Sequence, residues 1–145
     1  MTHIVRKLGL TLGDPNGIGP EIALKALNQL PTAALQSITV FGSQWVWEQT
    51  AKSLALESLA QQVQFKNIGD FSKSDFQPGL ISAQAGRSAV ESATAAIQAC
   101  ETGELDAVIA CPHHETAIHQ AGIAFSGYPS LVAKVCGLKE DDVFL

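Results

Sequence analysis

The stretch "GDPNGIGPEI", residues 13–22, holds three glycines and two prolines in ten positions. It follows the apolar run "KLGLTL" at 7–12 and leads into a segment whose apolar residues recur with the 3.6-residue period of a helix. This order predicts a strand over 4–12, a tight turn, and a helix over 20–29. A strand, a turn and a helix in direct succession are typical of the first unit of an α/β protein.

The rest of the chain repeats this alternation. Further strands are predicted at 37–42, 62–68 and 106–112, and further helices at 43–59 and 86–101. The last of these strands, "DAVIACP", is continuously apolar, which is typical of a strand covered on both faces. The sequence therefore predicts an α/β fold in which helices layer a sheet.

Apolar spacing also predicts which faces of two helices are buried. In the helix at 20–29 the predicted stripe is Ile22, Ala23, Ala26, Leu27 and Leu30. In the helix at 86–101 it is Ala89, Val90, Ala93, Ala96, Ile97 and Cys100, and Gly103 is expected to end that helix.

The remaining segments are a loop, a helix and a strand-like end. The polar stretch at 69–79 predicts a surface loop, and Leu131, Val132 and Val135 predict one more helix. Residues 142–145 resemble the start of a strand. We therefore expect the chain to be the first portion of a longer protein.

Composition limits the classes of function. The 145 residues are 46% hydrophobic, enough for the core of about one domain, and carry a formal net charge of -5. We expect no nucleic-acid partner and no membrane association, because there is neither a basic patch nor an apolar run of roughly 18 residues. The N-terminus lacks the apolar region of a secretory signal. Three widely spaced cysteines predict reduced thiols, and with them a cytoplasmic location.

The turn at 13–20 is the first candidate site, because ligands of such folds bind beyond the carboxyl ends of strands. Asp14 is placed there to contact a hydroxyl group or a cation, and the amides at the helix start can bind an anion. We expect Gly17 and Gly19 to adopt positive φ and to keep the backbone close to a ligand or to a neighbouring loop. The spacing G-x-x-x-G-x-G is neither the dinucleotide fingerprint nor a P-loop. A tight turn without a ligand remains the alternative.

The second candidate site is "CPHHETAIHQAGIAFSGYPS", residues 111–130, with three of the four histidines. A zinc-protease motif is excluded, because it would need histidine where Ile118 stands. His114 and His119, five residues apart, point roughly 140° from each other on a helix and cannot share a metal on one face. We therefore expect no metal site within this chain. At least one of His113 and His114 is expected to face the site, where imidazole can hydrogen-bond or exchange a proton; a polar turn is the alternative.

Tyr128 lies in the turn "SGYPS" at the end of this segment. An aromatic side chain there can either line a pocket or cover the core. Both interpretations stay open from the sequence. Cys111 is expected to be a buried small apolar residue and not a nucleophile.

Together, "GDPNGIGPE" and "DAVIACPHHETAIHQAGIAFSGYPSLVA" resemble the 4-hydroxythreonine-4-phosphate dehydrogenases of vitamin B6 synthesis. Usual versions of these motifs read G-D-P-x-G-I-G-P-E, then T-x-P-x-x-K followed by A-G, F and G-H-T-E. The resemblance covers nearly the whole chain. It implies an isocitrate/isopropylmalate dehydrogenase-like fold and a homodimer that binds NAD and a divalent metal, zinc or similar, in an interdomain cleft.

The sequence departs from that family where the family holds the substrate phosphate. Tyr128 and Pro129 replace a His-Thr pair, and Glu115 replaces a lysine. A phosphate dianion needs donors and cations, whereas a phenol beside a proline suits a flat ring. This variant resembles the terephthalate cis-dihydrodiol dehydrogenase branch. That branch uses NAD to oxidise 1,2-dihydroxy-3,5-cyclohexadiene-1,4-dicarboxylate, which then loses carbon dioxide to give protocatechuate.

The resemblance also implies that metal binding and part of the substrate contacts belong to two different halves of a longer enzyme. The family's three metal-binding histidines lie beyond Leu145, so residues 1–145 are expected to be the N-terminal α/β portion of a two-domain dehydrogenase, without the metal-binding half and inactive alone. Asp14, His113, His114 and Tyr128 are the expected contacts to a small-molecule substrate; the catalytic and NAD-binding residues stay unassigned. The alternatives are 4-hydroxythreonine-4-phosphate dehydrogenase itself and a non-catalytic binding module on the same scaffold.

Overall fold

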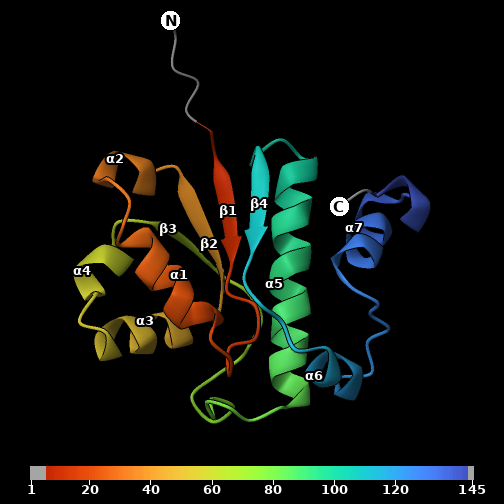
Figure 1. The fold of residues 1–145 in the computed structure, drawn as a ribbon, viewed down its shortest axis with the longest axis horizontal. Coiled ribbons are helices and arrows are strands. Elements are labelled where there is room, and N and C mark those ends of the chain that lie inside the picture. The colour runs from red at the N-terminus through yellow and green to blue at the C-terminus, as the bar shows by residue number, and fades with distance from the viewer. Residues whose placement is uncertain (1–5, 144–145) are drawn as a thin grey trace, which may run out of the picture.

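The computed structural model describes residues 6–143 and contains one sheet of four parallel strands (Figure 1). The strands are β1 (Leu8–Thr11), β2 (Ile38–Gly42), β3 (Gln64–Asn67) and β4 (Ala107–Ala110), in the spatial order β3-β2-β1-β4. The predicted α/β class is confirmed, and each of these strands lies within a segment predicted as a strand.

Helices connect the strands and follow the last one. They are α1 (Gly19–Leu27), α2 (Thr32–Leu35), α3 (Gln44–Ser53), α4 (Glu57–Ala60), α5 (Ala83–Glu101), α6 (Glu115–Gln120), α7 (Tyr128–Cys136) and the 3-10 turn η1 (Glu140–Asp142). None of the helices described over 6–143 has both the length and the apolar character that a bilayer span needs.

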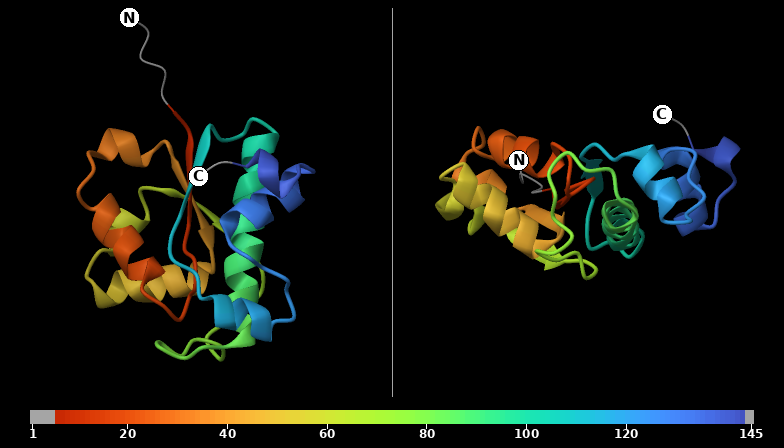
Figure 2. Two further views of the ribbon diagram at one scale, coloured as in Figure 1. Left: turned by 45° about the vertical axis from the view of Figure 1, so that its right-hand side comes forward. Right: turned by 90° about the horizontal axis from the view of Figure 1, so that it is seen from below.

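The sheet lies between two helical layers, as the view from below shows (Figure 2). Leu10 and Val40 point to one face and pack with residues of α1 and α3. Phe41, the next residue along β2, points to the other face and packs with Ala96 of α5. Side chains alternate between the two faces of a strand, so both faces of the central strands are buried. Helices α6 and α7 pack on α5, outside the sheet.

The strand order creates a switch point between β1 and β4. From β1 the chain runs to β2 and then β3 on one side, and α5 carries it back to β4 on the other side of β1. The loops that leave the carboxyl ends of β1 and β4 meet at this switch point. Open α/β sheets bind ligands at such a point.

Local sequence explains both ends of α5. The helix begins three residues before the predicted Gly86, because the Ser82 hydroxyl caps it by accepting a hydrogen bond of 3.2 Å from Ala85 N–H. It ends as predicted at Gly103, whose φ of 76° lets its N–H reach the carbonyl of Cys100 at 3.0 Å.

The predicted helix at 43–59 is two helices, and the prediction of one was wrong. The chain turns at Ala55, which has φ of 55°, and Leu56 N–H reaches back to Ala51 O at 2.8 Å. Leu54 and Leu56 pack against the core on either side of this turn. The helix α3 therefore ends beside two partly buried leucines, where no glycine or proline marks a boundary.

The buried face of α1 differs from the predicted stripe. Ile22 and Leu30 are 39% and 43% exposed, whereas Leu24, outside the predicted stripe, is fully buried. The buried set is Gly19, Pro20, Ala23, Leu24 and Leu27. The two stripes share Ala23 and Leu27, so the buried face is turned by only part of the roughly 100° that separates neighbouring residues on a helix.

β4 is one of the two edge strands of the sheet, and within the described residues its faces are not both covered as predicted. Ile109 is 55% exposed, and Ala107 and Ala110 are also exposed. Only Val108 packs against a core cluster, below α5. A continuously apolar sequence shows that this strand carries no charged residue. It does not show which elements pack on the two faces of the strand.

Two further predictions are modified near the ends and in the long loop. Asp142 lies in η1 and not in a strand, and residues 1–5 and 144–145 lie outside the described part of the chain. The segment 69–79 is a loop as predicted, but Phe71 is buried, and its carbonyl accepts a hydrogen bond of 2.8 Å from Ser43.

Candidate functional site

The loops that follow β1 and β4 bond directly to each other at the switch point. Asp14 N–H donates to Pro112 O at 2.9 Å, and Cys111 N–H donates to Thr11 O at 3.0 Å. Gly13, with φ of 67°, makes this approach possible, because a Cβ at that position would lie 2.1 Å from Pro112 O. The two stretches that the sequence singled out form one structural unit.

Asp14 carries a buried carboxyl group, of which one oxygen accepts a hydrogen bond from the main chain. It is 6% exposed, and its Oδ1 accepts the main-chain N–H of Asn16 at 2.8 Å. Burial raises the pKa of this carboxyl, and the N–H of Asn16 and the charge of His114 oppose the rise. No side-chain hydrogen bond to Oδ2 is formed among the described residues, although the N–H of Gly17 also helps to lower the pKa of this carboxyl. Oδ2 is therefore the better candidate to accept from a ligand.

His114 is the histidine that lies beside Asp14. It precedes α6 with an extended backbone, and its ring is close enough for its charge to lower the pKa of Asp14. Nδ1 of His114 is buried and makes no hydrogen bond within residues 6–143. The described residues include no direct ion pair between these side chains.

His113 takes no part in that pair. Its ring packs edge-on against Phe125 and Tyr128, with centroids 4.8 and 4.9 Å away. Burial lowers the pKa of His113, and the nearby Glu115 carboxylate opposes this shift. His113 therefore lies in an aromatic cluster, and His114 is the histidine whose charge acts on Asp14.

Tyr128 contacts His113 through its ring and not through its hydroxyl group. It is the first residue of α7, after Gly127 with φ of 114°, and its hydroxyl donates a long hydrogen bond of 3.4 Å to Cys111 O. Burial raises the pKa of this hydroxyl, while the neighbouring Thr11 opposes the rise. Thr11 Oγ1 is itself buried without a partner in the described structure. The hydroxyl thus points toward the end of the sheet, and the ring covers His113.

The two glycines expected to need positive φ do not have it, and that expectation was wrong. The positive φ belongs to Gly13, and a Cβ on Gly17 would meet nothing closer than 3.4 Å. The expected close approach is found at Gly19, where a Cβ would lie 1.9 Å from Leu12 O. Gly19 is therefore required by the neighbouring backbone, and Gly17 is not.

Asn16 is a buried polar residue that sequence reasoning missed. It is 3% exposed and accepts the N–H of Gln77 at 2.8 Å through Oδ1. Its only signal in the sequence is an asparagine inside a turn, where such side chains commonly bond to backbone. The partner segment, 61 residues away, carries no motif that would identify it.

The described residues do not fit the metal or the NAD that the resemblance implies. Within 6–143 there is no group of three or more histidine, cysteine, aspartate or glutamate side chains that could hold a metal, and Asp14 with His114 supplies two donors. The glycine spacing at 13–19 does not match a pyrophosphate-binding turn. We therefore assign no chemical step to either group within this chain.

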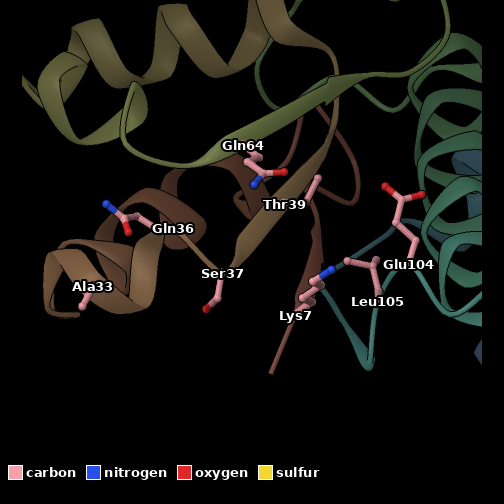
Figure 3. A pocket seen from close by; sticks show the side chains of 8 residues that line it. All are labelled: Lys7, Ala33, Gln36, Ser37, Thr39, Gln64, Glu104 and Leu105. Carbon is pink, nitrogen blue, oxygen red and sulfur yellow. The ribbon is translucent and has the colours of Figure 1, made fainter. Parts of the chain in front are cut away.

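A separate cavity of about 430 Å³ lies at the amino ends of the strands (Figure 3). Lys7, Ser37 and Glu104, each near the start of a strand, help to line it. The site residues Asp14, His113, His114 and Tyr128 do not. This cavity lies at the end of the sheet opposite to the switch-point loops.

Comparison with known proteins gives one matching family and several close relatives. The family described as "Pyridoxal phosphate biosynthetic protein PdxA" matches residues 34–145. A 1,2-dihydroxy-3,5-cyclohexadiene-1,4-dicarboxylate dehydrogenase of Comamonas sp. is 58% identical over all 145 residues. A 4-hydroxythreonine-4-phosphate dehydrogenase of Sulfurihydrogenibium sp. (strain YO3AOP1) is 32% identical over 92% of the chain.

Solved structures show the same fold. The terephthalate 1,2-cis-dihydrodiol dehydrogenase from Burkholderia xenovorans LB400 superposes on 94% of the chain, with a TM-score of 0.76 and 35% identity. A 4-hydroxythreonine-4-phosphate dehydrogenase from Burkholderia phymatum also covers 94%, with a TM-score of 0.79 and 24% identity, a level that supports the fold alone.

The chain spans less than half the length of these relatives. It covers 46% and 44% of the Comamonas and Sulfurihydrogenibium proteins, and 42% and 45% of the two solved chains. The expected family is thus confirmed for the part of the protein represented here.

Proposed function

This chain belongs to the PdxA family, and from that membership we propose that it is the N-terminal, substrate-binding part of an NAD-dependent dehydrogenase acting on 1,2-dihydroxy-3,5-cyclohexadiene-1,4-dicarboxylate. The observation that carries the proposal is the 58% identity, over the full chain, to a protein named for that substrate. Identity to the 4-hydroxythreonine-4-phosphate dehydrogenase quoted above is 32%.

The proposed reaction is an oxidation followed by loss of carbon dioxide. One hydroxyl-bearing carbon gives a hydride to NAD and its oxygen releases a proton, which leaves a ketone β to a carboxylate. Cleavage of the bond to that carboxylate releases carbon dioxide, and the ring becomes the aromatic ring of protocatechuate. The divalent metal and NAD are proposed to be held by residues outside this chain.

The proposed role of Asp14 and His114 is to bind and orient a substrate hydroxyl. Oδ2 of Asp14 is the open acceptor of the pair, and Nδ1 of His114 is a buried nitrogen without a partner in the described structure. An unpaired buried polar atom costs about 1–3 kcal/mol, which a bound hydroxyl would recover. A substrate with two adjacent hydroxyls suits such a site.

The aromatic cluster of His113, Phe125 and Tyr128 is proposed to form the wall beside this pair. The three rings meet edge to face, and the centroids of Phe125 and Tyr128 are 6.1 Å apart. A rigid, uncharged wall suits a flat ring better than an open phosphate ester.

The charge at the start of α6 disfavours a phosphorylated substrate, and the two carboxylates of the cyclic diol would feel the same charge. Glu115, the first residue of α6, is exposed and close enough to His113 for its charge to affect the pKa of that ring. The N-terminal end of a helix attracts anions. A carboxylate at that end instead repels a phosphate. Each charge-assisted hydrogen bond that a phosphate fails to make costs roughly 1.5–3 kcal/mol.

The longer protein that carries this chain tests the proposal. It is assayed with NAD and a divalent metal against the cyclic diol and, separately, against 4-phosphohydroxy-threonine, and both NADH and protocatechuate are measured. We expect turnover of the diol with formation of protocatechuate. Preference for the phosphorylated substrate would assign the protein to pyridoxine synthesis instead, and diol binding without NADH would make it a binding module.

We also propose the arrangement of the whole enzyme. The isocitrate/isopropylmalate dehydrogenase-like description, a second domain, a homodimer and a cytoplasmic location all follow from the family resemblance. The lengths of the relatives support a further portion of chain, since this one covers 46% of the Comamonas protein. Light scattering of the longer protein gives the subunit number, and a monomer would contradict the dimer.

A further inference from the structure

We propose that Asn16 is a positioning residue of the site. Its hydrogen bonds hold the segment 77–82 against the loop 13–18, and this fixes the position of the Asp14 carboxylate. The inference rests on the proposed role of Asp14 as a substrate contact. Asn16 itself is not expected to touch the substrate, because its own hydrogen-bonding groups are occupied within the fold.

The main chain of Asn16 bonds in two directions. Its N–H donates to Asp14 Oδ1 at 2.8 Å, and its carbonyl accepts the N–H of Gly79 at 2.7 Å. The bond to Asp14 holds one carboxylate oxygen and so directs the other outward. Any movement of the Asn16 backbone therefore moves the carboxylate.

The side chain of Asn16 bonds to the same segment. Oδ1 accepts Gln77 N–H at 2.8 Å, and Nδ2 donates to Leu80 O at 3.2 Å and, at 3.5 Å, to Ser82 Oγ. Both amide donors of the side chain are used, and the residue is 3% exposed. No donor is left over for a ligand, which separates a positioning role from direct contact.

The fastened segment has little else to hold it. Residues 77–81 are exposed, and Leu80 and Ile81 remain 46% and 42% accessible. The segment ends at Ser82, the cap of α5, and α5 packs against β1, β4 and α6. Asn16 therefore ties the loop that carries Asp14 to the helix beneath both site loops.

The test uses Asn16→Ala in the longer protein with the cyclic diol as substrate. The variant keeps the main-chain N–H that bonds Asp14 but loses the three side-chain bonds to the segment. We expect KM for the diol to rise roughly tenfold, because small displacements of a binding group have effects of this size, while kcat and KM for NAD change less than about threefold.

Ser43→Ala is the matched control. Ser43 is 2% exposed, donates to Phe71 O at 2.8 Å and accepts from Val46 N–H at 3.3 Å, so it fastens an earlier part of the same long loop away from Asp14. We expect a comparable fall in Tm with unchanged KM. An equal rise in KM in this control would overturn the proposal, since general loosening would then explain both variants.

A second variant and a second measurement keep the proposal testable if Asn16→Ala does not fold. Asn16→Asp has the same shape and keeps the acceptor for Gln77 N–H, but it places an oxygen against Leu80 O; KM for the diol should again rise. Hydrogen exchange at the amides of Gln77 and Gly79 should accelerate in both variants. Unchanged exchange at Gln77, or unchanged KM for the diol, refutes the inference.

If the unmodified protein does not turn over the diol, the proposed function fails. The exchange measurement then still decides whether Asn16 holds the segment 77–82 in place.

Discussion

The main-chain N–H of Asp14 donates a hydrogen bond of 2.9 Å to the carbonyl oxygen of Pro112. This bond joins the loop after β1, which carries Asp14, to the loop after β4, which carries His114. Each loop therefore fixes the position of the other, and the site depends on backbone contacts that tolerate little change. The predictions below follow from these contacts and from the environment of the side chains around them.

Gly19→Ala should destabilise the protein strongly, whereas Gly17→Ala should not. The new Cβ at residue 19 would lie 1.9 Å from Leu12 O, and at residue 17 nothing would be closer than 3.4 Å. Forcing atoms into a packed site costs roughly 1–3 kcal/mol or more, because the backbone must shift. Thermal denaturation of both variants beside the unmodified protein measures this difference. Equal Tm values for the two variants would contradict the close approach.

Asp14→Asn should raise stability at neutral pH while impairing activity on the diol. Burial raises the pKa of Asp14 above its unfolded value of 3.8, so the ionised carboxylate opposes folding at neutral pH. This cost is fully present above the folded pKa and is lost as the pH falls through it toward 3.8. The amide keeps Oδ1 as an acceptor without the charge. The gain in Tm should therefore be largest at neutral pH and shrink in acid.

Asp75→Asn is the control with the opposite sign. The N–H and hydroxyl of Ser72 both donate to Asp75, at 2.9 and 2.8 Å, and lower the pKa of its carboxyl. Replacing this exposed residue should leave Tm unchanged or slightly lower. A rise in Tm with Asp75→Asn equal to that with Asp14→Asn would show that net charge, and not burial, is responsible.

Replacing Tyr128, Pro129 and Glu115 together by His, Thr and Lys should shift the longer protein toward phosphorylated substrates. The change removes a carboxylate near His113 and introduces donors and a cation that a phosphate can use. We expect kcat/KM for the diol to fall, because the ring that packs on His113 at 4.9 Å is lost, and affinity for 4-phosphohydroxy-threonine to rise.

Tyr128→Phe separates the ring from the hydroxyl in that experiment. The hydroxyl makes one long bond of 3.4 Å to Cys111 O, so its loss should change kcat/KM for the diol by no more than about fivefold, in keeping with the roughly 1 kcal/mol of a weak hydrogen bond. If Tyr128→Phe were as damaging as Tyr128→Ala, the hydroxyl and not the ring would be the important group.

The 145-residue chain alone should bind no stoichiometric zinc and should not reduce NAD. Asp14 and His114 offer two donors, and a firm zinc site needs three or four. Metal analysis after dialysis and an NADH assay on the purified chain check this prediction. One firmly retained zinc per chain, or turnover, would contradict the assignment of the metal to other parts of the enzyme.

Much of the fold could be predicted from the sequence, because glycine and proline mark its turns and strand-like runs alternate with helical ones. The end of α3 could not, since Ala55 takes the left-handed conformation that glycine usually marks, and the burial of Leu54 and Leu56 decides it. The edge position of β4 depends on which strands are its neighbours, and the composition of Ile109 and Ala110 carries no such information.

The site was predictable as two loops but not as a set of contacts. His113 and His114 are adjacent in a segment that leaves a strand, so their side chains point to opposite sides, and no local pattern says which side faces Asp14. Asn16 bonds to a segment 61 residues away, and a short turn motif gives no information about a partner at that distance.

The place of β1 between β2 and β4 also has a consequence for how the chain acquires its structure. β2 pairs with β1 after a connection that holds only α1 and α2, whereas the contact from Lys7 to Asp106 beside β4 spans 99 residues. Contacts of such separation form late, because closing a long loop costs entropy before any pairing offsets it. During synthesis one side of β1 therefore stays without a hydrogen-bonding partner until β4 has emerged from the ribosome. Over that interval the nascent chain exposes an unpaired strand edge, and Asp14 and His114 are the last parts of the sheet's carboxyl end to meet.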